Sequence, residues 1–315
     1  MTAPYPFLST TLPTAPKRLL TQARSLPTPR VALVNAGAVT PLLGIREAAE
    51  AGLAEPILIG DTAKIRAAAA AIDYDISNLR IVHAPHAEAS DKAAELAREG
   101  EVDAIMKGQV HTSTFLKSLL PTKAGLRDKD TRCAHLFHIT TPQSDRPLLL
   151  TDAALNVDPS IETRQACLAH AVALAQALGI PRPKAALLAP SEDATPSIAN
   201  TMESASIAEW AKANLPQADV AGPIAMDLIL SKQAAEIKGY TSTVAGDADI
   251  IITPNITTGH AVCELMGLGM GCCAGGLVVG ARVPFLLTYR SQEAAARLAS
   301  AALGAISAHQ VKKAL

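Results

Sequence analysis

The stretch "IMKGQVHTSTF" (Ile105–Phe115) changes its secondary-structure pattern within a few residues and so indicates the fold class. An apolar run stops at Lys107 and Gly108, and a histidine and two hydroxyl residues then precede an amphipathic segment. We predict a buried strand that passes directly into a helix. The free N–H groups of a helix N-terminus bind anions, but the same residues also suit a capped helix with a surface lysine. From this stretch alone both interpretations stay open.

Short apolar runs alternate with helical segments on both sides of this stretch. We predict strands at residues 30–34, 56–60, 80–84 and 103–108, each followed by a helical segment. Such repetition is typical of a doubly wound parallel sheet. The pattern stops between residues 123 and 151, where "RCAHLFHITT" alternates apolar and polar residues like an edge or hairpin strand. A second series, with strands at 184–190 and 248–254, then completes what we expect to be two α/β lobes with a cleft between them.

The composition excludes several classes of protein. A chain of 315 residues suggests about two domains. Its net charge of −1 gives no electrostatic basis for binding nucleic acid or a membrane surface. The five cysteines form no C-x-x-C pair, which suits reduced, buried thiols in a cytoplasmic protein. The most apolar region, 268–287, is interrupted by glycines, an arginine and a proline, so we expect no membrane span.

Familiar catalytic motifs are missing or out of place. "GMGCCA" (Gly269–Ala274) fits the dinucleotide pattern G-x-G-x-x-A, but a helical pattern precedes it and a strand-like run follows it, which is the reverse of the required context. The sequence contains no P-loop, no G-x-S-x-G elbow and no H-E-x-x-H. We therefore predict neither a nicotinamide cofactor at that motif nor a metal centre.

Polar residues gather in the loops that follow the predicted strands. In open α/β sheets ligands bind at the carboxyl ends of strands. Turns rich in Asp and Asn give the same appearance, so "TDAALNVDP" and the loop that contains Glu192 are also explained as ordinary turns. As a set these residues favour an anionic substrate, and they are Lys107, His111, Thr112, Asp152, Asn156, Glu192, Asn255 and Arg290.

From about residue 30 to its end, the chain resembles the phosphate acetyltransferases and phosphate butyryltransferases. The stretches that carry the resemblance are "MKGQVHT" (106–112), "TDAALNVDP" (151–159), "ALGIPRPKAALLAPSE" (177–192), "AGPIAMD" (221–227), "KGYTSTVAGDADIIITPNITTGH" (238–260) and "GARVPFLLTYR" (280–290). The resemblance implies the two-lobed α/β fold of isocitrate and isopropylmalate dehydrogenases. One lobe would hold residues 1–145 plus 281–315, and the other would hold 146–280.

The resemblance also implies an activity and an assembly. Acyl-CoA and phosphate would react reversibly to give acyl phosphate and CoA, with acetyl as the expected acyl group, no cofactor and a homodimeric enzyme. Several positions depart from the family pattern. Tyr289 stands where a serine precedes Arg290, Gln292 stands where an acid is expected, and Asp247 replaces a cation in "AGRAD". Ala134 stands at the serine position of "RxSH". His260 and Glu264 stand at the asparagine and lysine positions of "GN…K".

These observations give a predicted site. We expect catalysis to involve His111, Tyr289, Arg290 and Glu293. We expect substrate binding to involve Lys107, Gly108, Thr112, Arg132, Asp152, Asn156, Glu192 and Asn255. Arg290 and Thr112 would hold phosphate, and His111 or Lys107 would donate to the carbonyl oxygen. The alternatives are a divergent member that binds CoA or acyl phosphate with little turnover, and a dehydrogenase of the shared fold.

Overall fold

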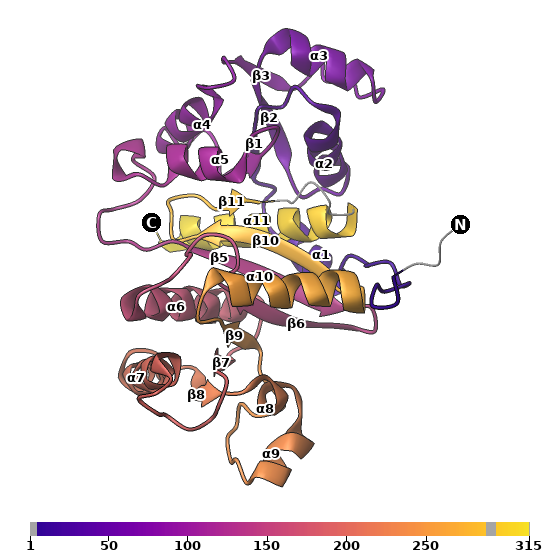
Figure 1. Cartoon of the computed structure of the whole chain (residues 1–315). Coiled ribbons are helices and arrows are strands. Elements are labelled where there is room, and N and C mark those ends of the chain that lie inside the picture. The colour runs from indigo at the N-terminus through magenta and orange to yellow at the C-terminus, as the bar shows by residue number, and fades with distance from the viewer. Residues whose placement is uncertain (1–4, 288–293, 315) are drawn as a thin grey trace. The chain divides into compact units, whose positions relative to one another are not determined.

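The structure is a computed structural model that describes residues 5–287 and 294–314. It shows a mixed α/β protein whose chain forms two compact units (Figure 1). The first, called the split unit, contains Pro13–Thr131 and the chain from Cys273 onward. The second, called the middle unit, contains Arg132–Cys272 and the N-terminal segment as far as Leu12. The boundaries expected from the sequence lay at residues 145 and 280 instead.

The split unit contains the strands that the opening stretch predicts. They are β1 (Arg30–Val34), β2 (Glu55–Gly60), β3 (Arg80–His83), β4 (Ala104–Lys107), β10 (Cys273–Val279) and β11 (Phe285–Leu286). Their order is β3-β2-β1-β4-β11-β10, and all neighbours are parallel except β10 and β11. The doubly wound parallel pattern is thus confirmed for β1 to β4. The order in which the strands are added reverses between β1 and β4, which is the kind of switch point where such sheets bind ligands.

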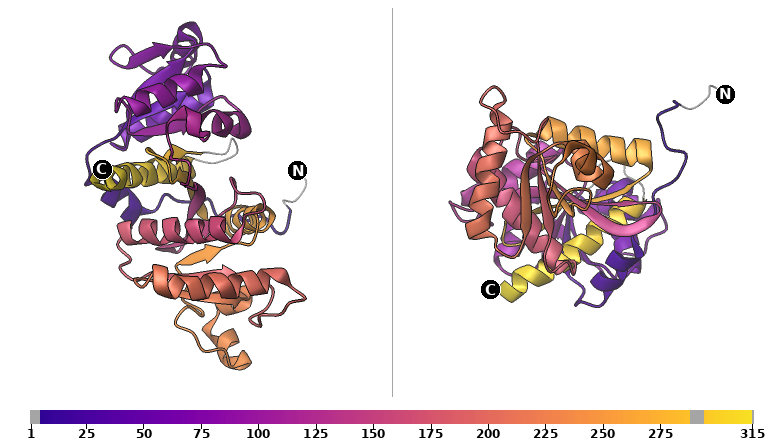
Figure 2. Two further views of the ribbon diagram at one scale, coloured as in Figure 1. Left: turned by 90° about the vertical axis from the view of Figure 1, so that its left-hand side faces the viewer. Right: turned by 90° about the horizontal axis from the view of Figure 1, so that it is seen from below.

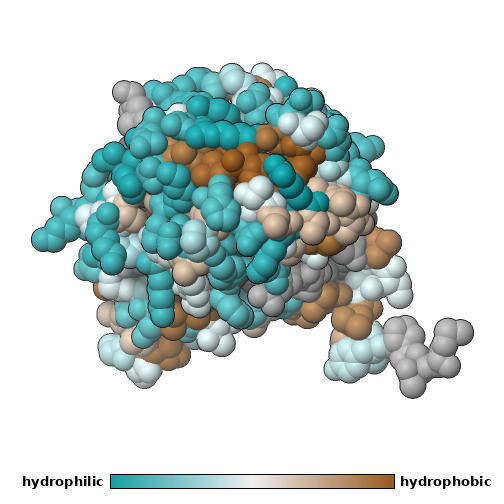
Figure 3. Space-filling view, turned by 90° about the horizontal axis from the view of Figure 1, so that it is seen from above, coloured by the Kyte–Doolittle hydropathy of each residue, from teal (hydrophilic) through white to brown (hydrophobic). Residues whose placement is uncertain are grey.

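Helices follow these strands as predicted. They are α2 (Val39–Glu50), α3 (Thr62–Ala70), α4 (Ala89–Arg98), α5 (Thr112–Leu119) and α11 (Ala294–Ala314). Two further elements were not predicted, namely α1 (Lys17–Arg24) before β1 and the 3₁₀ helix η1 (Thr122–Ala124) after α5. Asp61 caps α3 by accepting from the Lys64 amide. The face with α3 and β3 carries a hydrophobic patch among hydrophilic side chains (Figure 3). A cavity of about 570 Å³ lies beside α3 and β3, lined among others by Ala70, Tyr74, Ile76 and Ile81.

The middle unit combines a hairpin with parallel strands. Its strands are β5 (Ala134–Thr141), β6 (Ser144–Thr151), β7 (Lys184–Leu188), β8 (Asp219–Ile224) and β9 (Ile250–Ile252), in the order β5-β6-β9-β7-β8. The first two are antiparallel and the others run parallel to β6. The predicted hairpin is confirmed, but its alternation does not mark an exposed face. All β5 residues except Thr141 are buried, including His135, His138 and Thr140.

The helices of the middle unit are α6 (Ile161–Ala177), α7 (Ala199–Asn214), α8 (Met226–Leu230), α9 (Lys232–Lys238), α10 (Ile256–Glu264) and the π-helical turn η2 (Leu265–Gly269). The first two run side by side (Figure 2). The helix–glycine–strand sequence at residues 260–279 confirms that "GMGCCA" lacks a dinucleotide-binding context. Among the residues described, no helix is both long and apolar enough to cross a membrane.

Candidate active site

The loop from Lys107 to Thr112 lies at the carboxyl edge of the split unit's sheet. It follows β4, whose last residue pairs with Val34 at the end of β1. Gly108 packs so tightly that a Cβ there would lie 2.1 Å from the Val34 carbonyl oxygen. The Gln109 amide donates to the Asn35 carbonyl at 3.1 Å. The glycine is therefore required because the loop crosses directly over the end of β1.

Lys107 is not a surface lysine. Its side chain is buried, with 7% of its surface exposed, and Nζ donates to the Val110 carbonyl at 3.3 Å. The ammonium group thus lies beneath its own loop. His111 occupies the N-cap position of α5, but its side chain makes no capping hydrogen bond and is exposed. Thr112 is the first helical residue and is half-buried. Within the described part of the chain, the N-terminus of α5 therefore keeps N–H groups that His111 does not cap.

The end of β11 reaches the same edge of the split unit. This strand runs parallel to β4, with Leu286 opposite Met106. Phe285 of β11 and Phe115 of α5 pack edge to face, with ring centroids 6.2 Å apart. Leu287 is buried directly after the strand. The chain therefore leaves β11 beside the Lys107 loop, but Tyr289, Arg290, Gln292 and Glu293 lie outside the described residues.

Asp152 lies at the corresponding edge of the middle unit, directly after β6. Its buried carboxylate accepts four hydrogen bonds. Oδ2 accepts from the amide of His135 at 2.9 Å and from Asn156 Nδ2 at 2.7 Å. Oδ1 accepts from the amides of Ala154 at 2.9 Å and Leu155 at 2.8 Å. This arrangement is that of a brace that fixes its own loop, rather than of a carboxylate directed towards a ligand.

The two asparagines stand close to this brace. Asn156 is half-buried and uses its amide N–H groups on the Cys133 carbonyl and on Asp152. Asn255 follows β9 and caps α10, with Oδ1 accepting from the amide of Thr258 at 2.9 Å. The amide of Ile256 donates to the carbonyl of Val157, so the loops after β6 and β9 are joined. The structure therefore gathers Asp152, Asn156 and Asn255 at one edge. This was expected, because each follows a strand whose carboxyl end lies at that edge.

Arg132 and Glu192 lie at two other positions of the middle unit. Arg132 is exposed and donates through Nη1 to Thr163 Oγ1 at 3.2 Å, in the first turn of α6. Glu192 follows β7, and one carboxylate oxygen lies 3.6 Å from Lys238 Nζ. The same ammonium group lies 3.1 Å from Asp227, and this contact chiefly raises the pKa of Lys238. Glu192 is thus one of two acids around a cation.

His135 is a residue of this edge that the predicted set omitted. Its ring is completely buried and packs against Phe137 at 4.5 Å between centroids. Neither ring nitrogen has a hydrogen-bond partner among the described residues. Burial lowers the pKa of His135 to about 4, although the charge of Asp152 acts in the opposite direction. Its place in the "RxSH" stretch was the one signal in the sequence that could have drawn attention to it.

Asn35, at the end of β1, was also omitted. It is buried, has a φ of 53° in the left-handed region, and donates through Nδ2 to the His86 carbonyl at 3.2 Å. An asparagine directly after a strand and before "AGA" could have indicated it, because Asn tolerates this backbone conformation.

The five cysteines are interior residues. All five are buried and unpaired by disulfides, which confirms the interpretation as buried thiols. Burial raises the pKa of Cys167, close to Asp152, to about 12. The thiolate required for nucleophilic attack is therefore essentially unpopulated at neutral pH.

Asp247, which departs from the family pattern, is neutralised by cations of the middle unit. Its carboxylate lies 2.5 Å from Lys184 Nζ and 2.8 Å from Arg146 Nη1. These two hydrogen bonds, that of Lys184 first, lower the pKa of Asp247 to about 2. The anion is therefore part of an ion network that joins the starts of β7 and β9.

Comparisons with known proteins identify the family of this chain. The model of the phosphate acetyl/butaryl transferase family matches residues 83–305. Phosphate acetyltransferase of Rhizobium meliloti is 37% identical over 271 residues, which cover 85% of this chain and 85% of that protein. Phosphate butyryltransferase of Clostridium acetobutylicum is 34% identical over 292 residues, which cover 92% and 97%.

Solved structures give the same result. A branched-chain phosphotransacylase from Enterococcus faecalis V583 superposes with a TM-score of 0.78 at 26% identity, covering 89% of this chain and 99% of that one. A 4-hydroxythreonine-4-phosphate dehydrogenase from Burkholderia phymatum reaches a TM-score of 0.52 at 16% identity over 89% and 98%, which shows a shared fold alone. The family model and the two relatives cover most of the sequence, and the chain therefore belongs to the phosphate acetyl- and butyryltransferase family.

Proposed function

We propose that this phosphate acyltransferase transfers acetyl in preference to longer acyl groups, and that its phosphate site lies where β4 and β11 end. The observation that carries the site is the parallel pairing of these two strands. It brings the end of β11 beside the Lys107–Thr112 loop and the N-terminus of α5, which the His111 side chain does not cap. Phosphate would accept from the N–H groups at Thr112 and from the guanidinium of Arg290.

The reaction requires three contributions from the protein. In the direction of acyl phosphate formation, a phosphate oxygen attacks the thioester carbonyl, the C–S bond breaks, and the CoA thiolate leaves and takes up a proton. The negative charge that develops on the carbonyl oxygen needs a hydrogen-bond donor, which typically contributes about 3–4 kcal/mol. His111 suits this role because it is exposed at the start of α5, whereas buried Lys107 holds the loop. Acyl-CoA and phosphate are substrates, and this chemistry needs no further cofactor.

The preference for acetyl rests on Tyr289. A phenol is much larger than the serine hydroxyl expected before Arg290, so it would narrow the space for the acyl chain. We expect thiol release to be fastest with acetyl-CoA, slower with propionyl-CoA and slowest with butyryl-CoA, in each case with and without phosphate. The Tyr289→Ser variant should broaden the chain-length profile. A parent enzyme that prefers butyryl-CoA, or a variant with an unchanged profile, would contradict the proposal.

A second candidate is a family member that binds CoA or acyl phosphate with little turnover. The departures at Ala134 and Tyr289 favour it, because the first removes a serine hydroxyl of the family pattern and the second replaces one with a phenol hydroxyl further from the backbone. The two candidates separate in one pair of measurements. Calorimetric binding of CoA without measurable thiol release from any of the three acyl-CoA esters would support the second candidate.

We also propose that the enzyme is a homodimer and works in the cytoplasm. An exposed apolar surface in the middle unit supports the dimer, and its residues are Phe7, Leu8, Leu12, Leu265, Leu268 and Met270. The N-terminal segment is held against η2, because the Ser9 amide donates to the Leu268 carbonyl at 2.8 Å. Exposed apolar side chains that lie next to one another often mark a protein–protein contact. Light scattering should show a dimer for the parent and a monomer for Leu268→Asp. The five unbridged thiols support a reducing compartment.

A further inference from the structure

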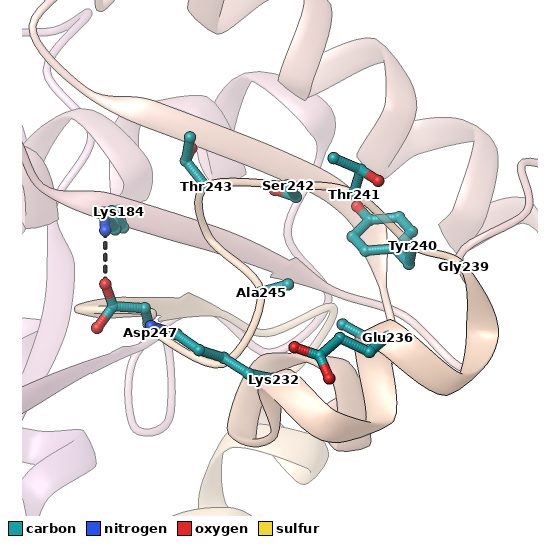
Figure 4. A pocket seen from close by; sticks show the side chains of 11 residues that line it. Lys184, Lys232, Glu236, Gly239, Tyr240, Thr241, Ser242, Thr243, Ala245 and Asp247 are labelled. Carbon is teal, nitrogen blue, oxygen red and sulfur yellow. Dashed lines mark hydrogen bonds and ion pairs between the residues drawn. The ribbon is translucent and has the colours of Figure 1, made fainter.

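A cavity of about 520 Å³ in the middle unit lies apart from the strand ends described above, beside the start of β7 (Figure 4). It opens between α9, the loop 239–247 and Lys184. Lys184 begins β7, and Asp247 precedes β9, so this hollow reaches towards the amino ends of these strands. Its size falls within the range of pockets that hold small ligands, roughly 300–1,000 Å³.

The walls of the cavity are firmly held. Gly239 ends α9 in the left-handed conformation, and the Tyr240 amide donates back to the Ala235 carbonyl at 2.9 Å. At the other end of the loop, the Gly246 amide donates to the Leu228 carbonyl at 2.8 Å. A Cβ on Gly246 would lie 2.3 Å from the Lys232 amide nitrogen, so the loop touches the backbone of α9. Tyr240 to Thr243 are thus presented from a fixed loop.

The charges at the cavity do not favour a small dianion. Lys184 is already paired with Asp247, which also accepts from Arg146. The remaining charged groups, Lys232 and Glu236, have opposite signs and lie one helical turn apart on α9. Because these charges offset one another, free phosphate gains little net attraction here.

The side chains of α9 and of the loop that follows it suit an aromatic base joined to a sugar. Figure 4 shows Glu236 and Tyr240 directed into the same hollow from α9 and from the loop that follows it. A tyrosine ring offers a flat face on which a base can stack. A carboxylate can accept from the hydroxyls of a ribose. Thr241 and Thr243 add hydroxyl groups along the same wall. Burial, followed by the charge of Glu192, raises the pKa of Tyr240, so its phenol remains neutral at physiological pH.

We propose that this cavity, which we call the Tyr240 pocket, binds a ribonucleoside, with the base on the ring of Tyr240 and the ribose hydroxyls on Glu236. The nucleoside could be free or could be the adenosine end of CoA, because both present the same chemistry. The proposal does not depend on which acyl group the enzyme transfers.

Calorimetric titration of the full-length protein with adenosine tests the proposal. We expect saturable binding that weakens about tenfold in Tyr240→Ala, because the stacking surface is lost. Tyr240→Phe should retain most of the affinity, and Glu236→Gln should lose part of it. Glu209→Gln is the matched control, since Glu209 is an exposed helical glutamate on α7 that does not line the cavity. Circular dichroism would establish that each variant is folded.

A competition experiment identifies the source of the nucleoside. If CoA displaces adenosine, the pocket receives the adenosine end of the substrate; if both bind together, it receives a free nucleoside. Absence of adenosine binding to the parent, or equal affinity of the parent and Tyr240→Ala, would overturn the proposal. Since the measurement is binding without turnover, its failure is distinct from a failure to release thiol from acyl-CoA.

Discussion

Replacing Asp152 by alanine should destabilise the middle unit strongly. The substitution removes the acceptor of four hydrogen bonds and leaves the donors of His135, Ala154, Leu155 and Asn156 without it. Leaving a buried donor unsatisfied costs about 1–3 kcal/mol, and hydrogen bonds to charged groups contribute about 1.5–3 kcal/mol each. The His135 bond is buried, whereas the other three donors are partly accessible to water and lose less.

We therefore expect a loss of about 3–5 kcal/mol in the free energy of unfolding, below the sum of four full bonds because such neighbours are not additive. This is a large share of a total stability of about 5–15 kcal/mol. Asp152→Asn keeps one carbonyl oxygen and the side-chain shape, so its loss should be roughly half as large. Asp158 is exposed in the same loop, and Asp158→Asn should change stability by less than about 0.5 kcal/mol.

Urea unfolding followed by circular dichroism measures these differences as shifts of the midpoint at constant slope. Thiol-release kinetics on the folded Asp152→Asn variant separate the brace from a direct ligand. A brace predicts a lower unfolding midpoint. A carboxylate that contacted substrate would predict an unchanged midpoint with a raised KM. A loss below about 1 kcal/mol for Asp152→Ala would refute the reasoning from buried donors.

Three further predictions concern other parts of the chain. Burial lowers the pKa values of His135 and His138 to about 4, whereas an unfolded histidine has a pKa of about 6.5. Between these values the unfolded chain binds more protons, so the free energy of unfolding should be full above pH 6.5 and fall by up to about 1.4 kcal/mol per pH unit per histidine towards pH 4. Urea midpoints that stay constant from pH 7 to 5 would contradict this prediction. Gly108→Ala should lower the free energy of unfolding by about 1–3 kcal/mol, because its Cβ would meet the β1 backbone. Gly267→Ala is the control and should be nearly neutral, because no atom lies within 4 Å of its Cβ. Urea unfolding of both variants measures the difference. Arg290→Ala should raise the KM for phosphate more than tenfold, because losing a desolvated charge pair costs about 2–5 kcal/mol. The KM for CoA should change less. A lower melting temperature with an unchanged KM for phosphate would show a structural role instead.

The local pattern around β4 was sufficient to predict a large part of the split unit. Its apolar run, glycine and amphipathic segment became β4, the Gly108 turn and α5. Such features depend on neighbours in sequence, so a single stretch contains them. The burial of Lys107 could not be predicted in the same way. It depends on the Val110 carbonyl and on strands far away in the chain, and the residue type alone suggested an exposed side chain.

The expectation that ligands bind at the carboxyl ends of strands predicted where polar residues would lie, but it did not predict their roles. Asp152 and Glu192 both follow parallel strands, as expected for ligand contacts. One instead accepts hydrogen bonds from its own loop and from β5, and the other lies near Lys238, 46 positions further along the sequence. Residue type and position in a loop are the same for a brace and for a ligand contact. The difference is set by the donors that the fold brings to each carboxylate, and these come from distant segments.

Asp247 shows why a departure from a family pattern cannot be judged alone. In sequence, Asp247 places an acid where the family pattern has a cation. In the structure Arg146 on β6 and Lys184 on β7, which are 101 and 63 positions away, donate to that carboxylate. With two cations beside it, the ionised carboxylate is strongly favoured, which is why its pKa falls to about 2. The local charge balance is thus retained by residues outside the motif, and the loss of the family cation is not in itself a reason to expect an inactive enzyme. Tyr289 lies outside the described residues, so the acyl-chain profile of Tyr289→Ser is the direct test of how far this chain has diverged.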